Sequence, residues 1–359
     1  MKRRQFLAAG AATAVAAPLA APAIAQGRLQ WNLVTSWPKN APGVGVNAQR
    51  FADRVTAMSD GRLTVRLYAA GELVPPFGVL DAVSAGTAEL GHATPYYWQG
   101  KAKALHYFTG VPLGLTAQEM AAWIYFGDGQ KLWDEVYAPF GVRAFYAGNS
   151  GTQAGGWFRK ELKGLDDLKG LKFRIAGLGA EVMRKLGVVV TLTPPGEIFQ
   201  AMQSGAVDAA EWVGPWNDLA FGLHRIAKFY YLPAFHEPGP SLEVIVNRAK
   251  FEALPKDLQA IVENAAMATA THALADFSYH NAMSLEPLVS QHQVQLRDWP
   301  AEIAAAFGPA TKAVLEEVAA GDPLTRKVHD SFSAFLAKAR AWTARSELSV
   351  MLMREKLLG

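Results

Sequence analysis

The sequence predicts an α/β protein of two doubly wound lobes, joined by hinge strands and followed by a long C-terminal helix. Apolar residues recur with alternating strand and helix periods, and short links rich in Gly and Pro separate the segments. The same order of strands and helices then occurs a second time in the chain. Half of the 359 residues are apolar, which is enough for two packed cores.

The first copy of the repeat comprises three strands and two helices in alternation. Its expected ranges are 29–36, 44–58, 63–68, 77–84 and 88–93. The second copy has the same order at 171–175, 180–186, 188–192, 196–203 and 207–213. Gly86 and Gly205 follow the second helix of each copy and are expected to end it in a left-handed turn. Such short links favour right-handed crossovers onto a parallel sheet, with a ligand cleft between the two lobes.

The remaining segments are expected to complete the lobes. An apolar strand at 242–247 is predicted to cross back to the first lobe, and another strand is expected at 296–299. Helical patterning from 254 continues through His280 and Leu288. From 301 onward the chain is almost all helix-forming, with breaks expected at Gly308-Pro309 and at 321–323.

These elements predict the following division of the chain. Lobe I comprises 26–149 and about 241–285, lobe II comprises 150–240 and about 286–324, and the long C-terminal helix comprises 325–359. A helix of that length outruns a single lobe. It is expected either to brace both lobes or to lean on another subunit, and its aromatic face makes a homodimer through this helix plausible.

Residues 1–25 have the features of an export leader. Arg3-Arg4 is followed by Phe6-Leu7, an Ala-rich apolar run and a small-x-small site that ends at Ala25. The arginine pair is typical of a twin-arginine signal peptide, and the alternatives are an ordinary secretory leader or an uncleaved amphipathic helix. The apolar run is too short to span a bilayer, so the mature protein is expected in the periplasm.

Composition excludes several classes of function. Removal of 1–25 takes three basic residues and no acids, so the formal charge falls from +3 to 0 and no nucleic-acid partner is expected. The chain contains no Cys, so thiolate chemistry and disulfides are absent. P-loop, zincin and nucleophile-elbow motifs are also missing.

Gly177-Leu-Gly179 begins like a dinucleotide motif, but Val182 stands where its third Gly is needed. The scattered histidines lack metal-ligand spacing and are expected to be structural; they include His92, His106, His224 and His236.

Four polar residues stand near the carboxyl ends of predicted strands, where apolar residues are the rule. They are Gln153, Arg174, Glu211 and Glu237. The guanidinium of Arg174 suits a carboxylate ligand, and the alternative is a salt bridge within the lobe. Glu211 lies in an apolar and aromatic run, so its burial requires a cation or a donor, and a metal ion would serve.

Five motifs carry a resemblance to a known family. They are Gly71-Glu-Leu-Val-Pro75, Pro95-Tyr-Tyr-Trp98, Gln153-Ala-Gly-Gly-Trp-Phe158, Gly170-Leu-Lys-Phe-Arg174 and Glu211-Trp-Val-Gly-Pro215. The mature chain resembles the extracytoplasmic solute-binding proteins of tripartite ATP-independent periplasmic (TRAP) transporters. It is most similar to the branch that binds small 2-oxo acids or 2-hydroxy acids.

The resemblance implies a transport function and a set of site residues. Arg174 is expected to pair with the substrate carboxylate, and Tyr97, with Tyr96 as the alternative, to hydrogen-bond the ligand from lobe I. The metal ligands implied are Gln153, Glu211, Trp212 and Glu237, around Na⁺ or Ca²⁺. Gln153, Glu211 and Trp212 would also adjoin the substrate, which the protein would deliver to the membrane permease subunits.

Physical chemistry is consistent with that implied site. Two carboxylates and one amide oxygen are hard ligands that suit Na⁺ or Ca²⁺, and they would repel an organic anion unless a cation lay between. Aromatic residues are expected to exclude water around a short apolar tail; they are Trp37, Tyr96, Tyr97, Trp98, Trp212 and Trp216. A binding protein rather than an enzyme is therefore expected. The alternatives are a periplasmic enzyme acting on a small carboxylate and a receptor for a dicarboxylate.

Overall fold

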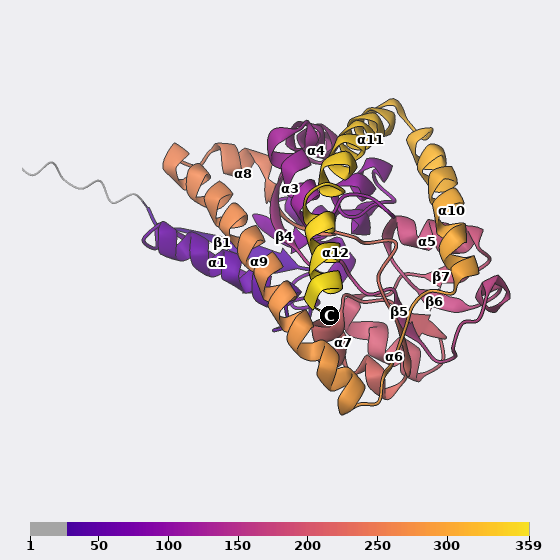
Figure 1. Cartoon of the computed structure of the whole chain (residues 1–359). Helices are drawn as coiled ribbons and strands as arrows, with labels where there is room; N and C mark the ends of the chain where they lie inside the picture. Colours follow the sequence, from indigo (N-terminus) through magenta and orange to yellow (C-terminus); the bar gives the residue numbers. More distant parts are fainter. Residues whose placement is uncertain (1–26, 359) are drawn as a thin grey trace, which may run out of the picture.

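The strands of the protein form two separate sheets in the computed structural model, which describes residues 27–358 (Figure 1). The predicted leader lies outside the described residues. The first sheet has the order β2-β1-β3-β10-β4, and the second has the order β11-β9-β5-β8-β6-β7. The strands of the first sheet are β1 (Leu29–Thr35), β2 (Leu63–Tyr68), β3 (Leu90–Ala93), β4 (Val142–Asn149) and β10 (Ser241–Asn247). Those of the second are β5 (Gly156–Phe158), β6 (Lys172–Arg174), β7 (Val189–Thr191), β8 (Ala209–Ala210), β9 (Phe229–Tyr231) and β11 (Gln295–Arg297). The predicted two-lobed α/β fold class is confirmed.

The expected repeat is present in both the element order and the strand pairing. In the first sheet β1 lies between β2 and β3, and both pairings are parallel. In the second sheet β6 lies between β7 and β8, again with parallel pairings. The helices of the two copies are α1 (Val44–Met58) and α2 (Val79–Ser84), and α5 (Gly177–Lys185) and α6 (Ile198–Gln203). Each repeat is therefore the same crossover unit used twice.

Both sheets also contain antiparallel pairs, which are made by strands outside the two parallel repeats. β10 pairs antiparallel with β3 and β4, and β5 pairs antiparallel with β8 and β9. The reason is that each sheet receives a strand from a segment that has just crossed between the lobes. β10 thereby confirms the predicted return of the chain to the first lobe.

The first lobe shows how the apolar pattern produces these layers. On α1 the residues Ala48, Phe51, Ala52 and Val55 follow a helical spacing, and all four are fully buried. α1 packs on β2, while α2 contacts β3 and β10. Four more α-helices are α3 (Ala117–Phe126), α4 (Gly129–Tyr137), α7 (Pro215–Phe221) and α8 (Arg248–Glu252). The short 3-10 helices are η1 (Pro76–Gly78), η2 (Pro95–Trp98), η3 (Lys103–Phe108), η4 (Ala138–Phe140), η5 (Leu165–Leu168), η6 (Pro195–Glu197) and η7 (Leu223–Arg225).

The helix that contacts both lobes is α9 (Lys256–Ser290), which runs along one side of the molecule (Figure 1). Its 35 residues extend over about 52 Å at 1.5 Å per residue. It packs against β4 and α1 of the first lobe and against α7 of the second. The pattern from 254 to Leu288 is thus one continuous helix, and it has the bracing role that was considered for the C-terminal helix.

The C-terminal region is helical, as predicted, but its breaks differ in part. α10 (Ala301–Ala319) continues through Gly308-Pro309, because the face that carries Phe307 and Val314 is buried and compensates for the missing hydrogen bond. The break at 321–323 is confirmed, and Asp322 caps the next helix by accepting from the Thr325 amide at 2.8 Å. The long C-terminal helix is divided by a turn at 344–346 into α11 (Pro323–Thr343) and α12 (Glu347–Leu358). α11 packs on η3, α3 and α4 of the first lobe.

Candidate functional site

Strand pairing places Arg174 beside Glu211. Arg174 ends β6, and its Cα partner on the parallel strand β8 is Ala210, so Glu211 is the next residue beyond the sheet. The Glu211 amide donates to the Arg174 carbonyl at 2.9 Å and fixes this register. Both side chains are buried, with 1% exposure each. The carboxyl ends of neighbouring parallel strands therefore bring the two charged groups together, as ligand sites in such sheets require.

The guanidinium of Arg174 is held by groups of its own lobe. Nη1 donates to the Glu211 carbonyl at 2.6 Å and to Glu211 Oε2 at 3.2 Å. Nε and Nη2 both donate to the Thr193 carbonyl, at 3.4 and 3.3 Å. The salt bridge within the lobe, which was the alternative for Arg174, is thus present. An incoming carboxylate would compete with Glu211 Oε2 for Nη1 and would find a further N–H on Nη2.

Gln153 and Glu237 lie on the two segments that connect the sheets, several residues beyond the ends of β4 and β9. The Gln153 amide donates to the Glu237 carbonyl at 3.1 Å, and the Ala234 amide donates to the Gln153 carbonyl at 2.9 Å. The Ala154 amide donates to the Val213 carbonyl at 2.9 Å and ties these segments to the loop after Glu211. The tertiary structure therefore brings Gln153, Glu211 and Glu237 into one region.

The site contains a group of buried oxygens without hydrogen-bond partners. They are Gln153 Oε1, Glu211 Oε1, Glu237 Oε1 and Glu237 Oε2. Buried polar atoms are nearly always paired, and each unpaired oxygen costs free energy. A cation bound by these residues would give a partner to each oxygen that it contacts. These oxygens belong to three of the four residues that the family resemblance implied as metal ligands, so the donor set fits a hard cation such as Na⁺ or Ca²⁺.

The electrostatics of the two acids also favour a bound cation. Burial raises the pKa of Glu211 to about 8, although the Arg174 guanidinium acts in the opposite direction. Burial, with the nearby Glu211 as the next cause, raises the pKa of Glu237 to about 8. Without a cation, both carboxyl groups thus tend to hold a proton near neutral pH. A bound metal ion would displace these protons and restore the carboxylates as ligands.

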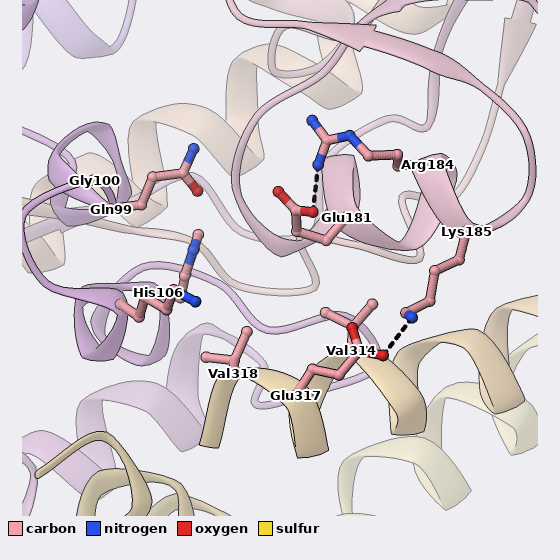
Figure 2. Close-up of a pocket in the computed structure, with 10 residues that line it drawn as sticks. Gln99, Gly100, His106, Glu181, Arg184, Lys185, Val314, Glu317 and Val318 are labelled. Carbon is pink, nitrogen blue, oxygen red and sulfur yellow. Dashed lines mark hydrogen bonds and ion pairs between the residues drawn. The ribbon is translucent and has the colours of Figure 1, made fainter. Parts of the chain in front are cut away.

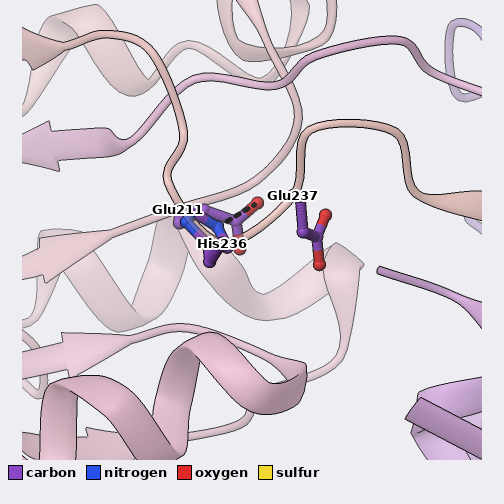
Figure 3. Close-up of side chains that lie close together, drawn as sticks. All are labelled: Glu211, His236 and Glu237. Carbon is purple, nitrogen blue, oxygen red and sulfur yellow. Dashed lines mark ion pairs between the residues drawn. The ribbon is translucent and has the colours of Figure 1, made fainter. Parts of the chain in front are cut away.

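His236 was expected to be structural, yet it lies beside Glu211 and forms a buried cluster with Glu211 and Glu237 (Figure 3). Its Nε2 is 4.0 Å from Glu211 Oε1, and one ligand atom each of Glu211, His236 and Glu237 lie within 4.8 Å of one another. Both ring nitrogens lack hydrogen-bond partners. Burial lowers the pKa of His236 to about 4, so the ring is neutral. Its position directly before Glu237 is the sequence feature from which this placement could have been inferred.

Two tyrosines approach the site from the first lobe on η2. Tyr97 faces Arg174, and Tyr96 faces Glu237. Tyr96 also lies against the start of α5, because a Cβ at Gly177 would come within 2.9 Å of its ring. The two tyrosines therefore face different groups of the second lobe, Tyr97 on the side of the guanidinium and Tyr96 on the side of the predicted metal ligands.

Only some of the expected aromatic residues surround the site. Trp212 lies 6.3 Å from Trp37 across the lobes, measured between ring centroids, and Trp37 lies 5.8 Å from Tyr97. Together with Gln153 and other residues, these rings line a cavity of about 20 Å³. Trp98 instead donates from Nε1 to Glu243 Oε1 at 3.0 Å in the first lobe, and Trp216 stacks on His280.

Asp218 supports the loop that carries Glu211 and was not singled out from the sequence. Its buried carboxylate accepts from Trp157 Nε1 at 2.9 Å, from the Tyr230 hydroxyl at 2.7 Å and from the Val213 amide at 3.1 Å. Burial raises its pKa to about 7, and these three donors act in the opposite direction. Asp218 thus joins β5, β9 and the loop after β8.

A larger hollow of about 430 Å³ lies elsewhere, between the η2–η3 region and the helices α5 and α10 (Figure 2). Its basic side chains are already paired in part, Arg184 with Glu181 and Lys185 with Glu317. None of the predicted site residues lines it. Size alone therefore does not identify the functional site in this protein.

The two-sheet fold, with Arg174 and Glu211 buried together where β6 and β8 end, is that of a two-lobed solute-binding protein. The chain belongs to the DctP family, bacterial extracellular solute-binding protein family 7, which its sequence matches over residues 33–322. The resemblance inferred from the motifs is confirmed, and the protein is a periplasmic solute-binding protein. No helix within residues 27–358 has the length and apolar character needed to cross a membrane.

Three similar proteins show what this fold and sequence type can bind. A monocarboxylate 2-oxoacid-binding periplasmic protein of Nostoc sp. is 44% identical over 321 residues, covering 89% of this chain and 88% of that protein. A TRAP solute-binding protein from Pseudoalteromonas atlantica, solved with sodium and pyruvate, has a TM-score of 0.88 and 38% identity, covering 90% of this chain and 98% of that one. One from Bordetella bronchiseptica, a mixed-occupancy dimer with calcium and picolinate in its active site, has a TM-score of 0.90 and 33% identity, covering 92% and 98%.

Proposed function

We propose that this protein captures a small 2-oxo or 2-hydroxy monocarboxylate together with Na⁺ or Ca²⁺ and delivers it to the membrane permease of a TRAP transporter. The observation that carries the proposal is the set of four unpartnered buried oxygens on Gln153, Glu211 and Glu237 beside the Arg174 guanidinium. The 2-oxoacid-binding relative from Nostoc and the pyruvate complex from Pseudoalteromonas support the same substrate class.

Each residue of the site has a distinct part in this proposal. Gln153, Glu211, Glu237 and the backbone at Trp212 would hold the cation, which supplies positive charge between the acids and the substrate. Arg174 would pair with the substrate carboxylate, and Tyr97, which faces Arg174, would hydrogen-bond the ligand from the first lobe. A ligand held in this way contacts both lobes and stabilises the form in which they meet.

The binding role is favoured over catalysis by the way the acids are arranged. Ligand atoms of Glu211 and Glu237 lie within 4.8 Å of each other, and their free oxygens are better suited to hold a cation than to move protons to and from a substrate. A plain fatty acid lacks the second oxygen donor and is expected to bind less tightly than a 2-oxo acid, because the cation would keep an unfilled position.

A thermal-shift screen tests the proposed function. Pyruvate, 2-oxobutyrate, lactate, acetate and succinate are each added with Na⁺, with Ca²⁺ or with a chelator. We expect stabilisation by the first three ligands, dependent on the cation and rising with the logarithm of ligand concentration. Stabilisation by succinate alone would establish the dicarboxylate alternative, and stabilisation unaffected by the chelator would refute the metal site.

We further propose that the protein forms a homodimer through its C-terminal helices. α12 has no buried residue within the chain, and its large apolar side chains are exposed: Leu348, Val350, Met351, Leu352, Met353, Leu357 and Leu358. A groove of about 830 Å³ next to it is lined by Leu274, Phe335 and Trp342, among others. Such a continuous apolar surface is typical of an interface. The related Bordetella protein was solved as a dimer. Light scattering of the full chain and of Leu352→Glu tests this, with a monomeric wild-type protein as the contradicting result.

A further inference from the structure

We propose that Trp37 is the residue that limits the length and polarity of the substrate tail, and that His92 holds it in the required orientation. This inference rests on the proposed function, because it concerns the part of the same cavity that lies away from the charged groups. Trp37 stands just beyond the carboxyl end of β1, is 2% exposed, and lines the cavity together with Tyr97, Gln153 and Trp212.

The orientation of the Trp37 ring is fixed by buried hydrogen bonds. Its Nε1 donates to His92 Nδ1 at 2.8 Å, and His92 on β3 is fully buried. Asn47 lies 3.5 Å from the other ring nitrogen of His92 and donates to the Ala147 carbonyl at 2.9 Å. Rotation of the indole would leave a buried donor and a buried acceptor unpaired, which is costly. The polar edge of Trp37 is thus turned toward β3, and the apolar remainder is available to the cavity.

The cavity wall around Trp37 has consequences for the ligand. Among the described residues that line it, none carries a charge. A second carboxylate on the substrate tail would therefore be buried without a cationic partner. The present space of about 20 Å³ holds roughly one water molecule. The site should accept tails of one or two carbons, as in pyruvate and 2-oxobutyrate, and should reject branched 2-oxo acids and 2-oxo dicarboxylates.

Binding calorimetry in the presence of Ca²⁺ tests this assignment on the mature protein. The measured quantity is the ratio of Kd for 4-methyl-2-oxopentanoate to Kd for pyruvate. A loss of affinity that is common to both ligands cancels in this ratio. Trp37→Ala should make room for the branched tail and lower this ratio at least tenfold. In a closely fitting pocket, one added or missing methylene changes affinity by about 10–200-fold. If circular dichroism shows that Trp37→Ala does not fold, the same ratio is measured for Trp37→Leu, where a smaller decrease is expected. An unchanged ratio in the folded variant would overturn the assignment.

Two further variants separate the proposed roles. Trp216→Ala removes another tryptophan of the same region, one that stacks on His280 and does not line the cavity, so the ratio should stay at the wild-type value. His92→Phe removes the acceptor for the indole while keeping a ring, and it should lower the ratio if His92 positions Trp37. An unchanged ratio would show that His92 is only structural. Wild-type protein that binds no 2-oxo acid would instead refute the proposed function.

Discussion

Replacing Glu237 by Gln tests the cation site most directly. Both oxygens of the Glu237 carboxyl group are buried, and the side chain makes no ion pair with Arg174, so the change removes the carboxylate that would bind the cation without breaking an ion pair. The assay is the rise in Tm on adding pyruvate at about 100 times its wild-type Kd, with Ca²⁺ at one fixed concentration in every sample. A ligand at that concentration adds about 2.7 kcal/mol to the free energy of unfolding.

The expected shift follows from the size of the ordered chain. For about 330 residues the entropy of unfolding is about 0.7 kcal/mol/K, so 2.7 kcal/mol corresponds to a rise in Tm of about 4 °C. If Glu237→Gln weakens binding about 100-fold, the stabilisation falls to about 0.4 kcal/mol and the shift to about 0.6 °C.

Glu243→Gln is the matched control for this measurement. Glu243 is another fully buried glutamate, but it lies in the first lobe and accepts from Trp98 Nε1 and from the Tyr137 hydroxyl. This control should keep the full cation-dependent shift. A Glu237→Gln protein that also keeps the shift of about 4 °C would refute the assignment of Glu237 as a ligand.

Four other outcomes are expected. Arg174→Lys should weaken pyruvate binding at least tenfold by calorimetry, because an ammonium lacks the planar fork, and unchanged affinity would remove Arg174 from the site. Glu211 and Glu237 have pKa values raised to about 8, so Ca²⁺ affinity should increase as pH rises from 6 to 8; a flat profile would contradict proton displacement. Burial likewise raises the pKa of Glu243 to about 8, so its contribution to stability is complete below about pH 4.5 and is lost as pH rises through 8. Glu243→Gln should therefore flatten the denaturant-derived stability profile over that interval, and a profile identical to wild type would refute this. Asp218→Asn should lower the free energy of unfolding by about 1–3 kcal/mol, because an amide places a donor among three donors, and a loss near zero would contradict the network.

The repeat and its strand order could be predicted from local patterns. Helix 44–58 and strand 63–68 have the predicted bounds, since apolar spacing and terminal Gly residues are local properties. The resemblance motifs contain Arg174, Glu211 and Gln153 of the predicted site. Parallel pairing of β6 with β8 explains why two of these residues, 37 positions apart, lie in contact.

Other features depend on contacts that no local pattern contains. The break expected at Gly308-Pro309 is absent because burial of one face of α10 outweighs a missing hydrogen bond. His236 lies in the acidic cluster because backbone hydrogen bonds from Gln153 to Glu237 and from Ala154 to Val213 join its segment to the loop after β8. The Trp37–His92 bond likewise joins residues 55 positions apart.

The sequence by itself therefore determined the fold class, the duplicated unit and the residue types of the predicted site. Periodicity, turn residues and motifs involve residues that are close together in the sequence. Only the tertiary structure decided which oxygens remain unpaired, which helix spans both lobes and which aromatic rings line the cavity. The physical reason is that pairing and burial are properties of atoms brought together from distant positions, and their energies exceed the local preferences of any one segment.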